Sequence, residues 1–222
     1  MNEERLTLKV PGDGEVTAVV VMPEDADDVE GGVVIAHGQM NDLDHPLLVA
    51  FSEGVAERGY ASIRFNFPYR ERGENAPDKR EVLMAALREA RDELGSRVEA
   101  PIYLAGKSLG ARVASYVAET DKTPGLIYLG YPIHAPGGEP TRYEHLLEIE
   151  APMLFFVGDR DPYCDVEKLK KVLEGRALPS TVQIVDKGDH SFEVPEGDDR
   201  PQDVIYQEIA VVVADWLDEY GL

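Results

Sequence analysis

The chain has one cysteine, Cys164, among 222 residues, so it cannot form an internal disulfide. It also lacks an apolar run approaching the roughly 20 residues of a membrane-spanning helix, and its first five residues are largely charged rather than apolar. These absences predict a soluble, cytoplasmic protein in a reducing compartment. Cys164 lies close to Asp161 in the sequence, which allows a reactive role, but we favour a small buried hydrophobe, the usual behaviour of a free cysteine.

Positive charge is also scarce. Lysine and arginine together number 22 against 43 aspartates and glutamates, which gives a formal net charge of −21. Nucleic acids and anionic membrane surfaces would repel such a chain, so we expect neither as a partner. No linker rich in proline, glycine or serine divides the sequence, and we interpret residues 1–222 as a single domain.

Apolar segments typical of strands alternate with amphipathic segments typical of helices. The first two strands, 6–10 and 16–22, flank glycines that suit a hairpin turn. Strands are then predicted at 33–36, 61–65, 101–105, 126–129, 153–157 and 181–185, and helices at 46–58, 78–94, 109–119, 142–147, 166–173 and 201–219. This order predicts an α/β fold with a mostly parallel central sheet, an N-terminal hairpin and helices on both faces.

Residues 106–110 read Gly-Lys-Ser-Leu-Gly and lie between a predicted strand and a predicted helix. Glycines two residues on either side of Ser108 leave room for a sharp turn that exposes the hydroxyl at a helix N-terminus. Developing negative charge is favoured there by backbone N–H groups and the helix dipole. The context predicts a nucleophilic serine; the alternative is a glycine-rich turn with an incidental serine.

A serine nucleophile needs a general base and an acid that orients it. His190 follows the strand 181–185, and two aspartates follow the strand 153–157. We favour Asp161 as the orienting acid, because Asp159 directly follows the strand and suits a turn-forming role. The resulting order Ser108, Asp161, His190 is that of the α/β-hydrolases. The alternative for His190 is an exposed loop histidine.

Backbone N–H groups must also stabilise the oxygen that becomes negative during acyl transfer. One donor is predicted at Leu109, directly after the serine, and the second in the loop after the early strand 33–36. Gln39 is the favoured second donor and Met40 the next. We expect His37 to brace this loop rather than transfer protons.

The chain resembles the α/β-hydrolases over essentially its whole length, and more narrowly the small dienelactone-hydrolase-like branch that groups bacterial hydrolases with the KANL/Tex-type proteins. The matching segments are 37–38, 44–47, 64–69, 106–110, 129–132, 158–162 and 188–192. The resemblance implies a Ser-Asp-His hydrolase with Ser108, Asp161 and His190 at the matching positions. The chain departs from this branch at residues 39–41, Gln-Met-Asn, where small residues are common.

These observations predict a hydrolase of small carboxylic esters or thioesters that uses no metal or organic cofactor. We expect Met40, Asn66, Tyr69 and His134 to line the pocket, with loop packing as the alternative. The largest connection near the site, residues 131–141, is too short for a large lid, so short acyl groups should be preferred. The alternatives are a catalytically silent scaffold that binds proteins and an acyltransferase with the same three residues.

Overall fold

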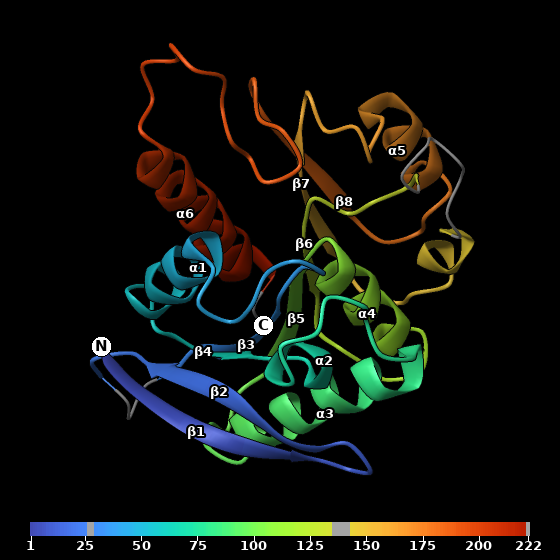
Figure 1. Ribbon diagram of the computed structural model, residues 1–222. Helices are drawn as coiled ribbons and strands as arrows, with labels where there is room; N and C mark the ends of the chain where they lie inside the picture. The colour runs from blue at the N-terminus through green and yellow to red at the C-terminus, as the bar shows by residue number, and fades with distance from the viewer. Residues whose placement is uncertain (26–28, 135–142, 221–222) are drawn as a thin grey trace.

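The computed structural model describes residues 1–25, 29–134 and 143–220, and its centre is one eight-stranded sheet. The strands are β1 (Asn2–Val10), β2 (Gly14–Met22), β3 (Gly31–Ala36), β4 (Tyr60–Phe65), β5 (Ile102–Lys107), β6 (Leu126–Leu129), β7 (Met153–Gly158) and β8 (Ser180–Val185). Their spatial order is β1-β2-β4-β3-β5-β6-β7-β8 (Figure 1). All pairs from β4 to β8 are parallel, whereas β1 and β2 run antiparallel to their neighbours.

Helices cover both faces of this sheet (Figure 1). They are α1 (Pro46–Ala56), α2 (Pro68–Glu71), α3 (Arg80–Gly95), α4 (Leu109–Ala118), α5 (Val166–Leu173) and α6 (Gln202–Tyr220), with a 3-10 turn η1 at Glu144–Leu147. Residues of α1 and α6 form one apolar core with one face of the strands, and residues of α3, α4 and α5 form another with the opposite face. The predicted fold class is therefore confirmed.

Several boundaries differ from the prediction. The hairpin strands are longer than expected, because β1 begins at Asn2 and β2 at Gly14. The one-turn helix α2 was not predicted, since four residues are too few to show helical periodicity. The helix expected at 142–147 is the shorter turn η1, and residue 142 lies outside the described residues.

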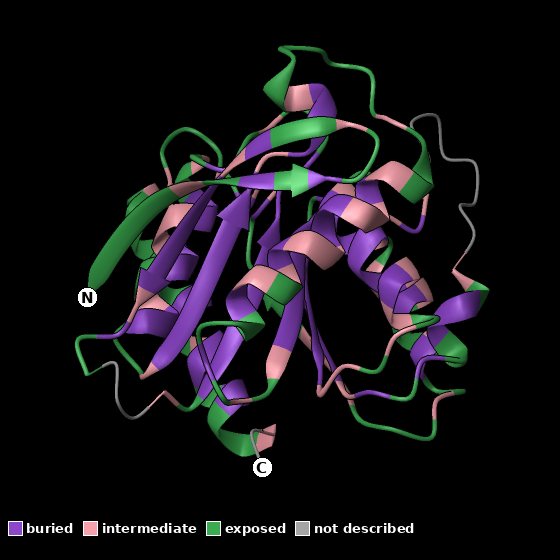
Figure 2. Cartoon of the chain, turned by 90° about the horizontal axis from the view of Figure 1, so that it is seen from below, coloured by how far each residue is buried: buried purple, intermediate pink, exposed green. Residues whose placement is uncertain are grey.

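How far a strand is buried depends on its position in the sheet. Every residue of β3, β4, β6 and β7 is buried, which matches the apolar runs expected of parallel strands covered on both faces. The outer strand β1 is largely exposed, as Figure 2 shows beside the N-terminus. The carboxyl ends of the central strands are where polar loops gather, and this edge carries the site described next.

Within the described residues no inserted domain covers that edge, in keeping with the predicted absence of a large lid. The connection expected to be the largest near the site, 131–141, lies mostly outside the described residues. None of the helices in the described ranges is long and apolar enough to cross a lipid bilayer.

Candidate active site

Ser108 occupies a strained turn between β5 and α4. Its backbone φ of 52° and ψ of −108° lie where residues other than glycine are rarely found. Packing enforces this turn: a Cβ on Gly106 would lie 2.3 Å from the carbonyl carbon of Gly110, and a Cβ on Gly110 would lie 2.2 Å from the carbonyl oxygen of Ala36. Both glycines are thus needed for helix α4 to pack closely on the sheet.

The structure brings Ser108, His190 and Asp161 together in one chain of hydrogen bonds. His190 Nε2 lies 2.9 Å from Ser108 Oγ, and His190 Nδ1 lies 2.8 Å from Asp161 Oδ2. The Asp161 side chain is fully buried, and its Oδ1 accepts the Tyr163 N–H at 2.8 Å. With its second oxygen held in this way, the carboxylate can fix both the orientation and the tautomer of the imidazole.

The loop that carries His190 is tied down on both sides of the imidazole. Asp189 Oδ1 accepts the N–H groups of Ser191 and Glu193 at 2.7 and 2.9 Å. Phe192 is fully buried in the core against α1 and α6, and its φ of 62° is again in the left-handed region. An anchored side chain and a strained backbone indicate that this loop is held in place by its surroundings.

Asp159, the alternative to Asp161 as the orienting acid, and Cys164, close to Asp161 in the sequence, have different environments. Asp159 is exposed, and its backbone N–H donates to Val185 O at 3.3 Å, as suits a residue that forms the turn. Cys164 is 3 % exposed within the core that includes α5, and burial raises the pKa of its thiol to about 12. A protonated, buried thiol is a poor nucleophile.

Two segments expected to supply backbone N–H donors lie beside Ser108. Leu109 is the first residue of α4, where N–H groups have no partner inside the helix. Across the site, Asn41 N–H donates to Gly38 O at 3.1 Å and closes a four-residue turn with Gln39 and Met40 at its centre. A Cβ on Gly38 would lie 3.5 Å from Ser108 Cβ, so this turn passes directly beside the serine.

His37 is fully buried behind this turn and connects it to the segment after β4. Its Nδ1 lies 2.7 Å from Gly38 O and its Nε2 lies 3.0 Å from the backbone nitrogen of Phe67. The neutral tautomer that satisfies both contacts donates from Nδ1 and accepts at Nε2. Burial lowers the pKa of His37 to about 4, so the ring stays neutral near pH 7. The expected bracing geometry is present.

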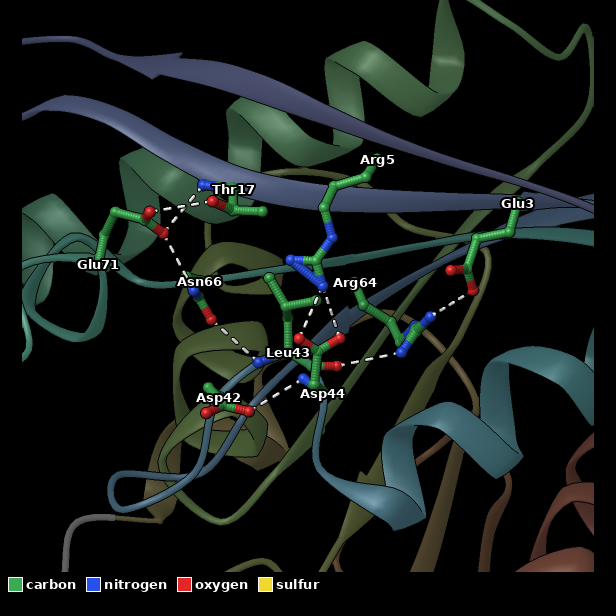
Figure 3. A network of polar contacts seen from close by, with 9 residues as sticks. All are labelled: Glu3, Arg5, Thr17, Asp42, Leu43, Asp44, Arg64, Asn66 and Glu71. Carbon is green, nitrogen blue, oxygen red and sulfur yellow. Dashed lines mark hydrogen bonds and ion pairs between the residues drawn. The ribbon is translucent and has the colours of Figure 1, made fainter.

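Asn66 and Tyr69, expected in the pocket, are placed behind the loop instead. Asn66 Oδ1 accepts Leu43 N–H at 3.0 Å and its Nδ2 donates to Glu71 at 3.0 Å, as Figure 3 shows. The Tyr69 hydroxyl donates to Gln39 O at 2.7 Å, and the residue is fully buried. Both side chains follow the carboxyl end of β4 as predicted, but their polar atoms bind the chain that borders the site.

A cavity of about 390 Å³ opens beside the serine. Its lining includes Met40 and His134, both expected there, together with Leu109. Sequence reasoning missed Tyr163, whose ring meets that of His190 edge-on at 4.6 Å, and Arg112. Arg112 could have been found from its spacing, because a residue four positions after Ser108 shares its face of the helix. Nothing in the spacing singles out Tyr163.

Lys107, next to the serine, is 3 % exposed, and its Nζ lies 3.5 Å from His190 O. Burial lowers the pKa of this ammonium, while the charges of Asp161, Asp189 and Glu193 act in the opposite direction. The ammonium contacts the main chain of the histidine loop, so Lys107 is not a free surface charge.

A mostly parallel sheet with an antiparallel hairpin, and a serine on a strained strand-to-helix turn, define the α/β-hydrolase class. The chain belongs to the family described as alpha/beta hydrolase domain, whose model matches residues 29–218. The resemblance to the α/β-hydrolases is thereby confirmed.

Solved structures share this fold along nearly the whole chain. An esterase domain from Rhodothermus marinus is 18% identical, with a TM-score of 0.77 and 100% of both chains covered. A dienelactone hydrolase from Anabaena variabilis is 20% identical, with a TM-score of 0.76 and 99% of this chain and 98% of the other covered. A serine hydrolase without lid from Xanthomonas campestris is 19% identical, with a TM-score of 0.78 and coverage of 99% and 95%. These likenesses establish the fold.

Proposed function

We propose that the protein hydrolyses small carboxylic esters or thioesters through an acyl-enzyme on Ser108. The observation that carries this proposal is the continuous hydrogen-bonded chain from Ser108 Oγ through His190 to Asp161, at 2.9 and 2.8 Å. Nucleophile, base and orienting acid are within the reach that acyl transfer requires. The esterase and dienelactone hydrolase among the similar structures support the same chemistry.

In the first half of the reaction, Ser108 Oγ attacks the acyl carbon while His190 Nε2 accepts the hydroxyl proton. The carbonyl oxygen becomes negative and accepts hydrogen bonds from the N–H groups of Leu109 and Gln39. When the tetrahedral intermediate collapses, His190 gives its proton to the departing alcohol or thiol, and the acyl group stays on Ser108. Water, deprotonated by His190, then attacks the acyl carbon. The second tetrahedral intermediate releases the acid as His190 returns the proton to Ser108 Oγ.

The size of the cavity supports a preference for small substrates. Its volume of about 390 Å³ is at the lower end of the roughly 300–1,000 Å³ typical of ligand pockets. An acetyl or butyryl ester fits within this volume, whereas a long acyl chain would extend into solvent. Short acyl groups should therefore be turned over faster than long ones.

The test is steady-state hydrolysis of p-nitrophenyl acetate, butyrate and palmitate by the full chain. We expect activity with the short esters and its loss by at least about 10⁴-fold in Ser108→Ala. Ser96→Ala is the matched control, because Ser96 is exposed at the end of α3 and should leave the rate unchanged. Preference for palmitate would contradict the predicted specificity, and equal rates for the two variants would contradict the role of Ser108.

Product analysis distinguishes the two alternative functions. A silent scaffold would hydrolyse none of these esters, although it folds. An acyltransferase would form a new ester or amide when an alcohol or amine is supplied, at the expense of free acid. We expect free acid as the main product.

A further inference from the structure

The turn at residues 38–41 has a defined geometry that decides where its N–H groups point. Its two central residues, Gln39 and Met40, both have negative φ, because the non-glycine residues with positive φ in the described chain are Ser108, Lys187 and Phe192. A type II turn requires positive φ at its third residue, here Met40. The hydrogen bond from Asn41 N to Gly38 O therefore closes a type I turn.

A type I turn is helical in its dihedral angles, so the N–H groups of its central residues point to one side, as at a helix N-terminus. The turn lies beside Ser108, where a Cβ on Gly38 would come within 3.5 Å of the serine Cβ. Its N–H groups form the kind of cluster that stabilises a developing oxyanion.

Conversion to a type II turn would reverse one peptide unit. It would change ψ of Gln39 by about 150° and φ of Met40 by about 170°, which exchanges the directions of Gln39 C=O and Met40 N–H. The Gln39 carbonyl oxygen would then lie on the side of the turn toward which the N–H groups point in the type I form. An oxyanion would meet a partial negative charge there, and one donor would be lost.

The side chains behind the turn hold these two peptide units separately. His37 Nδ1 binds the Gly38 carbonyl at 2.7 Å, and because the peptide is planar and trans this directs the Gln39 N–H the opposite way. The Tyr69 hydroxyl binds the Gln39 carbonyl at 2.7 Å and likewise directs the Met40 N–H. Gln39 O is the atom that a conversion to type II would displace.

We propose that Tyr69 is a positioning residue that keeps the turn at residues 38–41 in its type I form by holding the Gln39 carbonyl. This inference rests on the proposed acyl transfer at Ser108. Tyr69 belongs to α2, which begins with Pro68, and its ring is fully buried and stacked on Phe67 at 6.3 Å. Burial raises the pKa of the Tyr69 hydroxyl, so it remains a donor throughout the neutral range.

The variant that isolates this contact is Tyr69→Phe, which keeps the ring and removes the hydroxyl. With p-nitrophenyl acetate, kcat should fall by about 2- to 13-fold, the range of one net hydrogen bond, and KM should stay unchanged. Affinity for a trifluoromethyl ketone should fall by the same factor, because serine addition turns the ketone oxygen into an oxyanion. Tyr128→Phe is the control, since the Tyr128 hydroxyl is buried without a hydrogen-bond partner among the described residues.

A double-mutant cycle with Met40→Gly makes the test specific to the turn. Glycine adopts positive φ without strain, so it should make the type II form accessible once the Tyr69 hydroxyl is gone. Met40 is 63% exposed, so little packing is lost. We expect kcat of Tyr69→Phe/Met40→Gly to fall by more than the product of the two single effects.

Three results would overturn the proposal: an unchanged kcat in Tyr69→Phe, an equal loss in Tyr128→Phe, or multiplicative effects in the cycle. If the unmodified protein hydrolyses no ester, the proposed function has failed, and the crystal structure of the double variant decides this inference by itself. A reversed Gln39–Met40 peptide in that structure supports the role of Tyr69. An unreversed peptide contradicts it.

Discussion

The two turns that face each other across the site are held by different forces. Residues 106–110 are fixed by backbone packing, in which the absence of a Cβ at Gly106 and Gly110 lets a helix approach the sheet. Residues 38–41 are fixed by hydrogen bonds from side chains as distant in sequence as Tyr69. A packed turn cannot move without steric overlap, whereas a hydrogen-bonded turn can be released one contact at a time.

This difference affects what each turn tolerates. The strained backbone at Ser108 is held by packing contacts that no other interaction replaces. Small changes in side-chain volume there should therefore lower the stability of the fold. The turn at 38–41 accommodates large residues such as Gln39 and Met40 because the side chains that hold it, those of His37 and Tyr69, bind its carbonyl groups. The bulky residues at 39–41, where the dienelactone-hydrolase-like branch tends to have small ones, are thus compatible with a turn that lies beside Ser108.

The largest effect should come from adding one methyl group to the packed turn. In Gly110→Ala the new Cβ would lie 2.2 Å from Ala36 O, so α4 must shift. Overpacking of this kind costs about 1–3 kcal/mol or more of unfolding free energy, and a misplaced nucleophile should lower kcat by about 100-fold. Urea unfolding and ester hydrolysis measure the two effects.

Gly95→Ala is the matched control for this substitution. Gly95 ends α3, and a Cβ there would meet nothing within 4 Å. It should gain up to about 1 kcal/mol from helix propensity and retain its activity. Similar behaviour of the two alanine variants would show that packing does not hold the serine turn.

The next largest effect should be a pH-dependent loss of stability caused by His37. Burial lowers its folded-state pKa from 6.5 to about 4, so the unfolded chain binds the proton more readily. The stability that neutral His37 contributes is complete above about pH 6.5 and is lost as the pH falls toward 4, by up to roughly 3 kcal/mol.

Denaturant unfolding of the protein and of His37→Asn between pH 4 and pH 7 measures this contribution. Asparagine keeps a donor near the Gly38 carbonyl but does not titrate, so the variant should be less stable at pH 7 and less sensitive to acid. An identical pH dependence in both proteins would assign the acid sensitivity to other groups.

A smaller effect should come from the network behind the loop in Figure 3. Asn66→Ala leaves the Leu43 N–H without its partner and should cost about 1–2 kcal/mol of unfolding free energy, with a few-fold loss of kcat. Arg5→Ala removes an ion pair with Asp44 whose side chains are 53% and 57% exposed, and should cost less than about 0.5 kcal/mol. An equal loss of unfolding free energy in the two variants would contradict the expectation that the Asn66–Leu43 hydrogen bond stabilises the loop more than the exposed Arg5–Asp44 ion pair.

The meeting of Ser108, Asp161 and His190 could be predicted from the sequence because the signal for each of the three residues is local. Glycines flank the serine within five residues, and Asp161 and His190 each follow a strand whose apolar run is easily recognised. The spatial roles of Asn66 and Tyr69 could not be predicted. Tyr69 lies in a single helical turn, which has no periodicity, and the partners of the two side chains lie 23 and 30 positions away. The alternation of strands and helices predicted that Asn66 and Tyr69 follow the carboxyl end of β4. It could not predict whether their side chains line the pocket or bind the chain that borders it.

We propose that Ser108 is a nucleophile activated by His190. Fluorophosphonate labelling followed by mass spectrometry of the peptides measures this reactivity at the serine itself. One phosphonyl group should attach to Ser108, His190→Ala should abolish the labelling, and His45→Ala, at the start of α1, should leave it intact. Absence of labelling in the folded protein, or labelling at another residue, would contradict the account.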